Sequence, residues 1–198
     1  MGAAAVVVDL DGTIWDSEPW FASILATAAG IDPELAIWRL SHTPVATLIR
    51  RTRGMSPATF SRQAEKAIND LPLYPGVQET LSALSSAGVA LGVGTSLPGW
   101  IAKPMLAHTG LAPFFRAVVH SSNTTARKPS AAFLDSVLRV LGEHRGQEVW
   151  YVGDREVDAA AAHSAGVAFA WASYGYGPRP DSPIRKVLHS FPDLLEVL

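Results

Sequence analysis

The chain has 198 residues, of which 48% are hydrophobic and 17% charged, and its formal net charge is -2. This composition fits one large globular domain, or one domain with a small insert, and it lacks the basic face that binding of nucleic acid requires. The absence of cysteine excludes disulfides and thiolate metal sites, the six histidines show no zinc-ligand spacing, and no apolar run approaches the roughly 20 residues of a membrane span.

The first predicted element is a buried strand that ends at two carboxylates. The apolar run Val6-Val7-Val8 stops at Asp9-Leu10-Asp11, and Gly12-Thr13 then favours a turn. Side chains alternate along a strand, so Asp9 and Asp11 would point the same way if the extended geometry persists through Leu10. Two carboxylates on the same side of a strand end would lie close together and repel each other. A cation between them, a proton on one of them or hydrogen-bond donors would relieve this repulsion. The alternative is that Asp11-Gly12 forms a hairpin turn and that Asp9 caps it.

Residues 17–73 form a stretch with helical patterns throughout. A parallel crossover needs roughly one helix of chain, whereas the first two predicted strands are separated by about eighty residues. The surplus is therefore an inserted module, and we expect a small all-helical cap hinged over the two carboxylates, with the catalytic core at 1–16 and 74–198. Glycine and proline punctuation predicts its helices at 17–29, 33–40, 44–53 and 57–70.

From residue 74 onward, strand and helix patterns alternate. This alternation predicts an α/β fold, a doubly wound Rossmann-like parallel sheet with helices on both faces. The predicted strands are 89–94, 117–120, 149–152 and 167–171, and the predicted helices are 77–87, 99–109, 131–141, 157–164 and 192–197.

Polar residues follow three of these later strands. In a parallel sheet all carboxyl ends lie at one edge, where ligands bind. Thr95 and Ser96 offer hydroxyls and amides to an anion, Lys128 precedes a helix, and Asp154 and Asp158 lie about one helical turn apart and can face a cation. Each feature has a simpler alternative: Ser96 and Asp154 as helix N-caps, Lys128 as a solvated side chain, and Asp158 as a charge favourable to the helix dipole. All of these would have to coincide at one edge by accident.

The motifs in this order resemble those of the haloacid dehalogenase (HAD) superfamily. The resemblance covers essentially the whole chain and includes the helical insert, which is similar to the cap of the phosphoglycolate phosphatase-like branch. The segment after the fifth strand, Trp171-Ala172-Ser173-Tyr174-Gly175-Tyr176-Gly177, also resembles that branch. The matching motifs are Asp9-Leu10-Asp11-Gly12-Thr13, Thr95-Ser96, Lys128-Pro129 and Gly153-Asp154 through Asp158.

The resemblance implies a Mg²⁺-dependent phosphatase that acts on a small phosphorylated metabolite. Asp9 would attack phosphorus and form an aspartyl-phosphate, and Asp11 would act as general acid and then as general base. Mg²⁺ would be held by Asp9, by the backbone carbonyl of Asp11 and by Asp154, with Asp158 supporting Asp154 or a bound water.

The remaining predicted site residues bind substrate. Lys128, Thr95 and the amides of Gly12 and Ser96 would gather the phosphoryl oxygens. In the cap, the predicted turn Ser41-His42-Thr43-Pro44 resembles the substrate-facing loop of related caps, so His42 and Thr43 could bind the leaving group and Arg50 and Arg51 could attract an acidic substrate. The alternative is that His42 and Thr43 cap the next helix and that both arginines are solvated.

Other activities remain as alternatives. A dehalogenase of the superfamily lacks the second carboxylate, which is Asp11 here, and a sugar-phosphate mutase usually carries a histidine and an arginine near the places of Trp20 and Pro44. Phosphonate cleavage needs a lysine near the start of the cap. The predicted cap contains one lysine, Lys66, which lies near its end. A non-catalytic phospho-acceptor signalling domain would share Asp, Thr or Ser, and Lys, but has no need of Asp11 or a cap. We expect a cytoplasmic protein, and the sequence leaves open whether it is a monomer or a homodimer.

Overall fold

The computed structural model describes residues 4–142 and 148–197. Two compact units divide the chain: Met1–Trp15 together with Leu73–Leu198 form an α/β unit, and Asp16–Pro72 form a helical unit. Within the α/β unit, Trp15 and Leu73 pair in an isolated antiparallel bridge. The chain therefore leaves and re-enters the α/β unit at two adjacent positions.

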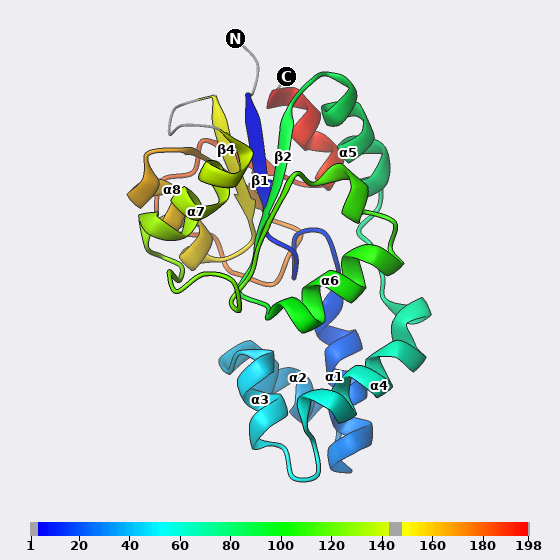
Figure 1. Cartoon of the computed structure of the whole chain (residues 1–198). Coiled ribbons are helices and arrows are strands. Elements are labelled where there is room, and N and C mark those ends of the chain that lie inside the picture. The colour runs from blue at the N-terminus through cyan, green and yellow to red at the C-terminus, as the bar shows by residue number, and fades with distance from the viewer. Residues whose placement is uncertain (1–3, 143–147, 198) are drawn as a thin grey trace. The chain divides into compact units, whose positions relative to one another are not determined.

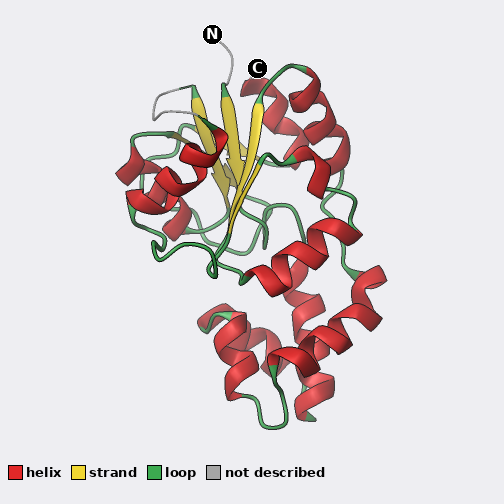
Figure 2. Ribbon diagram, viewed as in Figure 1, coloured by secondary structure: helices red, strands yellow, loops and turns green. Residues whose placement is uncertain are grey.

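The α/β unit is built on a six-stranded parallel sheet (Figures 1 and 2), in the order β3-β2-β1-β4-β5-β6. This confirms the predicted doubly wound fold. The chain winds outward from β1 in one direction through β2 and β3 and in the other through β4 to β6, so the switch point lies at the carboxyl ends of β1 and β4. The strands are β1 (Ala5–Val8), β2 (Ala90–Gly94), β3 (Ala117–Val119), β4 (Val149–Gly153), β5 (Ala168–Ala172) and β6 (Lys186–Leu188).

Helices cover both faces of the sheet because its strands are apolar on both sides. On one face, Val7, Tyr151 and Phe169 pack with Phe133 and Ala161 of the covering helices α7 (Ala131–Leu141) and α8 (Glu156–Ala165). On the other side, α5 (Val77–Ser86) lies beside the 3₁₀ helix η3, as Figure 1 shows. The unit is completed by α6 (Gly99–His108), η2 (Ala112–Phe114) and η3 (Phe191–Val197).

One short strand of this unit was missing from the sequence expectation. The strand β6 was not predicted, because a three-residue strand after a segment rich in glycine and proline gives no alternating pattern. The short final helix predicted at 192–197 is present as the 3₁₀ helix η3.

The helical unit is held together by aromatic side chains. Phe21 of α1 packs against Trp20 (5.2 Å between ring centroids) and Phe60 (6.0 Å), and Trp20 donates its indole N–H to the Ala67 carbonyl at 2.7 Å. Phe60 is buried and supplies the contact from α4. The elements of this unit are α1 (Ser17–Ala29), α2 (Pro33–His42), α3 (Val45–Arg51), α4 (Pro57–Ala67) and η1 (Ile68–Asp70).

The predicted turn at 41–44 is shorter in the structure. The helix α2 continues to His42, so only Thr43 and Pro44 separate it from α3. The reason is local: His42 donates from Nδ1 to the Trp38 carbonyl at 2.7 Å, one turn earlier in the helix. The Ser41 hydroxyl lies between two acceptors, the Ile37 carbonyl at 3.1 Å and Glu18 Oε1 at 2.8 Å. Among the described residues, no helix combines the length and apolar character needed to cross a membrane.

Candidate active site

Asp9 lies immediately after β1, at the switch point of the sheet. Its amide donates to the Val152 carbonyl of β4 at 2.9 Å, which extends the strand pairing by one residue and fixes the position of its side chain. The residue is 9% exposed. Its Oδ2 lies 2.8 Å from Lys128 Nζ, whereas its buried Oδ1 has no hydrogen-bond partner among the described residues. Asp9 is therefore a buried carboxylate with one oxygen available to a ligand.

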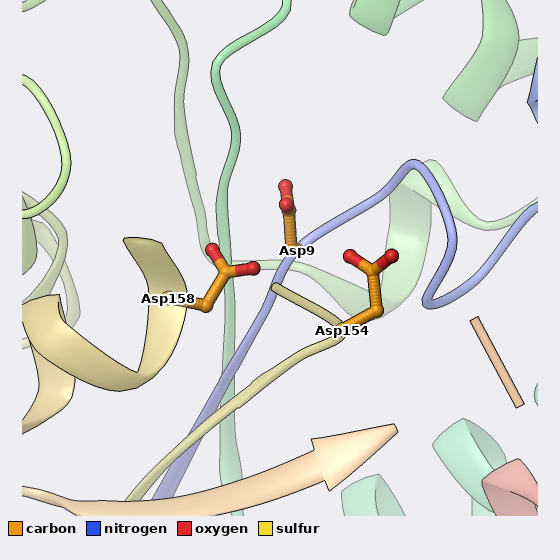
Figure 3. A group of neighbouring side chains, drawn as sticks. All are labelled: Asp9, Asp154 and Asp158. Atoms are coloured by element: carbon orange, nitrogen blue, oxygen red, sulfur yellow. The ribbon is translucent and has the colours of Figure 1, made fainter. Parts of the chain in front are cut away.

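Two further carboxylates reach the same place from β4 and α8 (Figure 3). Asp154 follows the end of β4, and Asp158 lies in the first turn of α8. Both are fully buried, and together with Asp9 each can offer an oxygen such that the three atoms lie within 4.8 Å of one another. Three carboxylates this close require compensating positive charge.

Lys128 supplies part of that charge. Its side chain is only 3% exposed, and Nζ lies 2.8 Å from Asp9 Oδ2 and 2.7 Å from Asp158 Oδ1. The ammonium also lies 5.4 Å from the centroid of the Tyr151 ring. The alternative of a solvated lysine is thus wrong, and Lys128 links carboxylates that come from two different elements.

Asp158 is occupied on both oxygens. Its Oδ1 accepts from Lys128 and from the Tyr151 hydroxyl at 3.0 Å, and its Oδ2 accepts from the Arg155 amide at 3.1 Å. The Tyr151 hydroxyl also lies 3.0 Å from the Gly94 carbonyl, so its single proton lies between two acceptors. Sequence reasoning missed Tyr151, whose only signal was one hydroxyl within an apolar strand.

Asp154 is held by the chain that follows β5. Its Oδ2 accepts from the amides of Tyr176 at 2.9 Å and Gly177 at 3.3 Å, and its buried Oδ1 has no hydrogen-bond partner within the described part of the chain. Gly12 packs directly against this carboxylate: its φ is +71°, and a Cβ there would collide with Asp154 Oδ2. The sequence could not indicate these amides, because backbone donors carry no residue signature.

The charges perturb one another strongly. Burial, then the charges of Asp158 and Asp9, raise the pKa of Asp154 to about 7. Burial likewise raises the pKa of Asp9, although Lys128 opposes the shift. Burial alone would lower the pKa of Lys128, but Asp158 and Asp9 outweigh it and the pKa is raised, so the lysine remains cationic. One lysine faces three carboxylates, and a cation is the natural complement to the remaining negative charge.

The residues fit a hard divalent cation. Asp9 Oδ1 and Asp154 Oδ1 are buried oxygens without partners, and carboxylate oxygens are the ligands that Mg²⁺ prefers. Asp158 is less suited to direct ligation because Lys128, Tyr151 and Arg155 already engage its oxygens. Asp11 is outside this group of three carboxylates, and its side chain is half-buried.

The other predicted residues of the α/β unit flank this cluster. Thr95 follows β2, next to β1, and is buried with its Oγ1 accepting from the Leu97 amide at 3.1 Å. Ser96 is exposed and does not cap α6, whose N-cap is Pro98. His42 and Thr43 belong to the helical unit, where His42 ends α2 and Thr43 is its C-cap.

Two further alternatives are wrong. Asp154 is not the N-cap of α8, because that position is Arg155. Asp11-Gly12 is not a hairpin turn, because β1 pairs with both of its neighbours in parallel. Asp158 does accept from the amide of Arg155, the N-cap of α8, so it stabilises the helix start as well as holding Lys128.

Comparison with known proteins decides the family. Residues 6–172 match the family model described as haloacid dehalogenase-like hydrolase.

The chain belongs to the haloacid dehalogenase-like hydrolase family.

Relatives of known name agree with this assignment. The chain is 28% identical to a phosphoglycolate phosphatase of Yersinia pseudotuberculosis, over 98% of this chain and 92% of the relative. It is 32% identical to a phosphoglycolate phosphatase of Cereibacter sphaeroides, over 98% of each. A crystal structure from Haemophilus somnus, described as a predicted phosphoglycolate phosphatase, superposes with a TM-score of 0.80 at 25% identity, covering 98% of this chain and 97% of that one. These findings confirm the prediction of a HAD-like hydrolase of the phosphatase type.

Proposed function

We propose that this HAD-like hydrolase is a Mg²⁺-dependent phosphatase that cleaves a small phosphate monoester through an aspartyl-phosphate on Asp9. The observation that carries the proposal is the state of Asp9: a buried carboxylate at the switch point of the sheet, with one oxygen paired to Lys128 and the other without a partner. A carboxylate so placed can act as a nucleophile toward phosphorus, while the adjacent lysine offsets the charge of an incoming phosphate.

In the first half-reaction, an oxygen of Asp9 forms a bond to phosphorus as the bond from phosphorus to the leaving oxygen breaks. Asp11 donates its proton to that leaving oxygen, so an alcohol departs rather than an alkoxide. Lys128, Thr95 and the Ser96 amide bind the equatorial phosphoryl oxygens, where charge is spread in the transition state. The Gly12 amide, which was also expected to bind phosphate, instead donates to the Trp15 carbonyl at 2.9 Å and is left out of this set. The distance of 2.8 Å between Lys128 Nζ and Asp9 Oδ2, and the position of Thr95 directly after β2, the neighbour of β1, support these roles.

In the second half-reaction, water attacks the phosphorus of the aspartyl-phosphate. Asp11 accepts a proton from this water, the bond between phosphorus and the Asp9 oxygen breaks, and inorganic phosphate leaves. The enzyme returns to its starting state with Asp11 protonated and Asp9 ionised.

Mg²⁺ would be held by Asp9, Asp154 and the backbone carbonyl of Asp11. The unpartnered Oδ1 atoms of Asp9 and Asp154 support this assignment. When bound, the metal neutralises phosphate charge and lets the anionic nucleophile approach. Asp158 serves this site through Lys128, whose ammonium it holds beside Asp9.

Phosphoglycolate is the first substrate to test, because relatives across nearly the full chain carry that activity in their names. The experiment measures release of inorganic phosphate from a set of small phosphorylated metabolites, with Mg²⁺ and after complete chelation. We expect turnover only with the metal. Activity that survives chelation would contradict the metal assignment, and stable phosphorylation without turnover would indicate a phospho-acceptor domain instead.

Asp11 can be tested through the leaving group. The variant Asp11→Asn should lower kcat/KM for alkyl phosphates by about 100-fold or more, because their poor leaving groups need a proton, and should affect a nitrophenyl phosphate much less. The measurement is kcat/KM for both substrates in the same preparation. Equal losses on the two substrates would count against the acid role.

We also propose that the helical unit supplies contacts to the leaving group, through His42 and Thr43. Two features support a ligand role for His42. It is exposed, and its Nδ1 donates to the Trp38 carbonyl, so Nε2 is the ring nitrogen left to contact a ligand. The Trp38 ring lies 4.7 Å from the imidazole and helps to fix its orientation.

A further inference from the structure

The loop that follows β5 holds Asp154 through its backbone. Tyr176 and Gly177 direct their amides at Asp154 Oδ2. The side chain of Trp171, within β5 itself, adds an indole N–H that donates to the Asp154 carbonyl at 3.1 Å. These contacts leave Asp154 Oδ1 as the oxygen that faces away from the loop's donors and has no partner of its own. The loop therefore sets the orientation of a candidate metal ligand.

The same loop also holds the turn that carries Asp11. The Tyr174 hydroxyl donates to the Thr13 carbonyl at 2.9 Å, two residues beyond Asp11. The Tyr174 ring packs edge-on against Tyr74, with centroids 4.8 Å apart. Burial raises the pKa of Tyr174, so its hydroxyl stays protonated and remains a donor across the neutral pH range.

Glycines bring these parts into direct contact. A Cβ on Gly175 would collide with the Gly12 carbonyl oxygen and with Asp154 Cβ, and a Cβ on Gly12 would collide with the Asp154 carboxylate. The loop, the Asp11 turn and Asp154 thus pack without space for a methyl group between them. A shift of the turn is transmitted to Asp154, and the reverse also holds.

We propose that Tyr174 is a positioning residue, whose hydroxyl holds the Asp11 turn in register with the metal site at Asp154. This inference rests on the proposed function, because it assigns the turn its acid/base group and a backbone ligand to the metal. Tyr174 reaches the reaction only through Thr13 and its neighbours, so its effect is on geometry.

The test compares two single-hydroxyl deletions in this loop. Tyr174→Phe removes the bond to the Thr13 carbonyl and keeps the ring that packs on Tyr74. Ser173→Ala is the matched control, because it removes a bond of similar length, 2.8 Å, from Ser173 Oγ to the Leu188 carbonyl, on the side of the loop that faces β6. Thermal unfolding of both variants verifies that each is folded before any comparison.

Two readouts separate positioning from a merely structural role. The first is the ratio of kcat/KM for an alkyl phosphate to that for a nitrophenyl phosphate, which should fall about tenfold in Tyr174→Phe because protonation of the leaving group depends on where Asp11 lies. The second is the Mg²⁺ dissociation constant, measured by calorimetry without substrate, which should rise about tenfold. Ser173→Ala should leave both quantities within about twofold of the wild type.

The proposal is overturned if Tyr174→Phe leaves the ratio and the Mg²⁺ affinity unchanged, or if Ser173→Ala changes them as much. Failure of the proposed function gives a different result. A wild-type protein that binds Mg²⁺ but hydrolyses neither phosphate contradicts the phosphatase proposal, and the calorimetric comparison of the two variants then decides the positioning role by itself. A wild-type protein that binds no Mg²⁺ overturns both proposals.

Discussion

Among single residues, Lys128 makes the central electrostatic contacts of the site, because it forms buried ion pairs with two of the three carboxylates. The ammonium is shared between Asp9 and Asp158, which come from β1 and α8, and almost no water reaches it. Removing one member of a buried pair leaves an uncompensated charge, which costs far more than loss of a surface pair. We therefore expect Lys128 to stabilise the folded state, apart from the role proposed for it in the reaction.

A matched pair of variants tests this difference. Lys128→Met should lower the free energy of unfolding by about 3–5 kcal/mol, because it strands two buried carboxylates. Lys186→Met breaks the ion pair between Lys186 and Glu196, whose side chains are 21% and 68% exposed, and should cost less than about 1 kcal/mol. Urea denaturation of both variants gives the comparison. Similar costs for the two would show that the buried carboxylates protonate or rehydrate readily.

Most side chains of the candidate site could be predicted from the sequence, for a topological reason. Asp9, Asp154, Asp158 and Lys128 follow strands of a parallel sheet, and all such strand ends meet at one edge. The loop amides on Asp154 could not be predicted, because a backbone donor is set by conformation and not by residue type. Tyr151 was missed for a related reason: its strand is apolar, and only the tertiary structure brings its hydroxyl to Asp158.

Among the helices and strands, the end of α2 is the place where the difference between prediction and structure matters most for the proposed site, because it changes how His42 is held. Glycine and proline signals predicted the helix to end at residue 40, but it continues to residue 42, where the His42 side chain bonds to the preceding turn. His42 is therefore presented by a helix terminus, with its ring packed at a tilt against Trp38. A group held this way loses less rotational freedom on binding than one in a loop.

Replacing His42 and Thr43 by alanine tests whether they contact the leaving group. Loss of one or two such contacts should cost about 1–3 kcal/mol in kcat/KM for the preferred metabolite. Hydrolysis of a nitrophenyl phosphate should change little, because the residues proposed for phosphoryl transfer lie in the α/β unit. The double variant and the wild type need equal melting temperatures for the comparison. If kcat/KM falls by the same factor for both substrates, His42 and Thr43 do not contact the leaving group.

For the whole molecule, the carboxylate cluster should make stability depend on pH and on metal. The pKa of Asp154 rises from its ordinary 3.8 to about 7 on folding. Between these values the folded protein holds a proton that the unfolded chain has lost, so the contribution of Asp154 to stability is fully present at low pH and is lost as pH rises toward and through about 7. In the metal-free protein, the ionised Asp154 carboxylate therefore lowers the free energy of unfolding at alkaline pH.

The variant Asp154→Asn isolates this contribution. Without metal, it should be more stable than the wild type by about 1–3 kcal/mol at pH 8, and the difference should shrink at pH 5. Added Mg²⁺ should raise the melting temperature of the wild type at pH 8 and have little effect on the variant. If the difference in the free energy of unfolding between the wild type and the variant is the same at pH 5 and at pH 8, the raised pKa of Asp154 is contradicted.

The central claim is that Asp9 carries the phosphoryl group during turnover, and trapping that group tests it most directly. In Asp11→Asn the second half-reaction lacks its base, so the aspartyl-phosphate should accumulate. The protein is mixed with Mg²⁺ and a nitrophenyl phosphate, whose leaving group departs without a proton from residue 11. The mixture is then quenched in acid, digested and analysed by mass spectrometry. We predict one phosphoryl group on the peptide that contains Asp9, and none when Asp9→Asn is added to the same variant. Phosphate release by Asp11→Asn without a phosphorylated peptide, or with the phosphoryl group on another residue, would contradict the account.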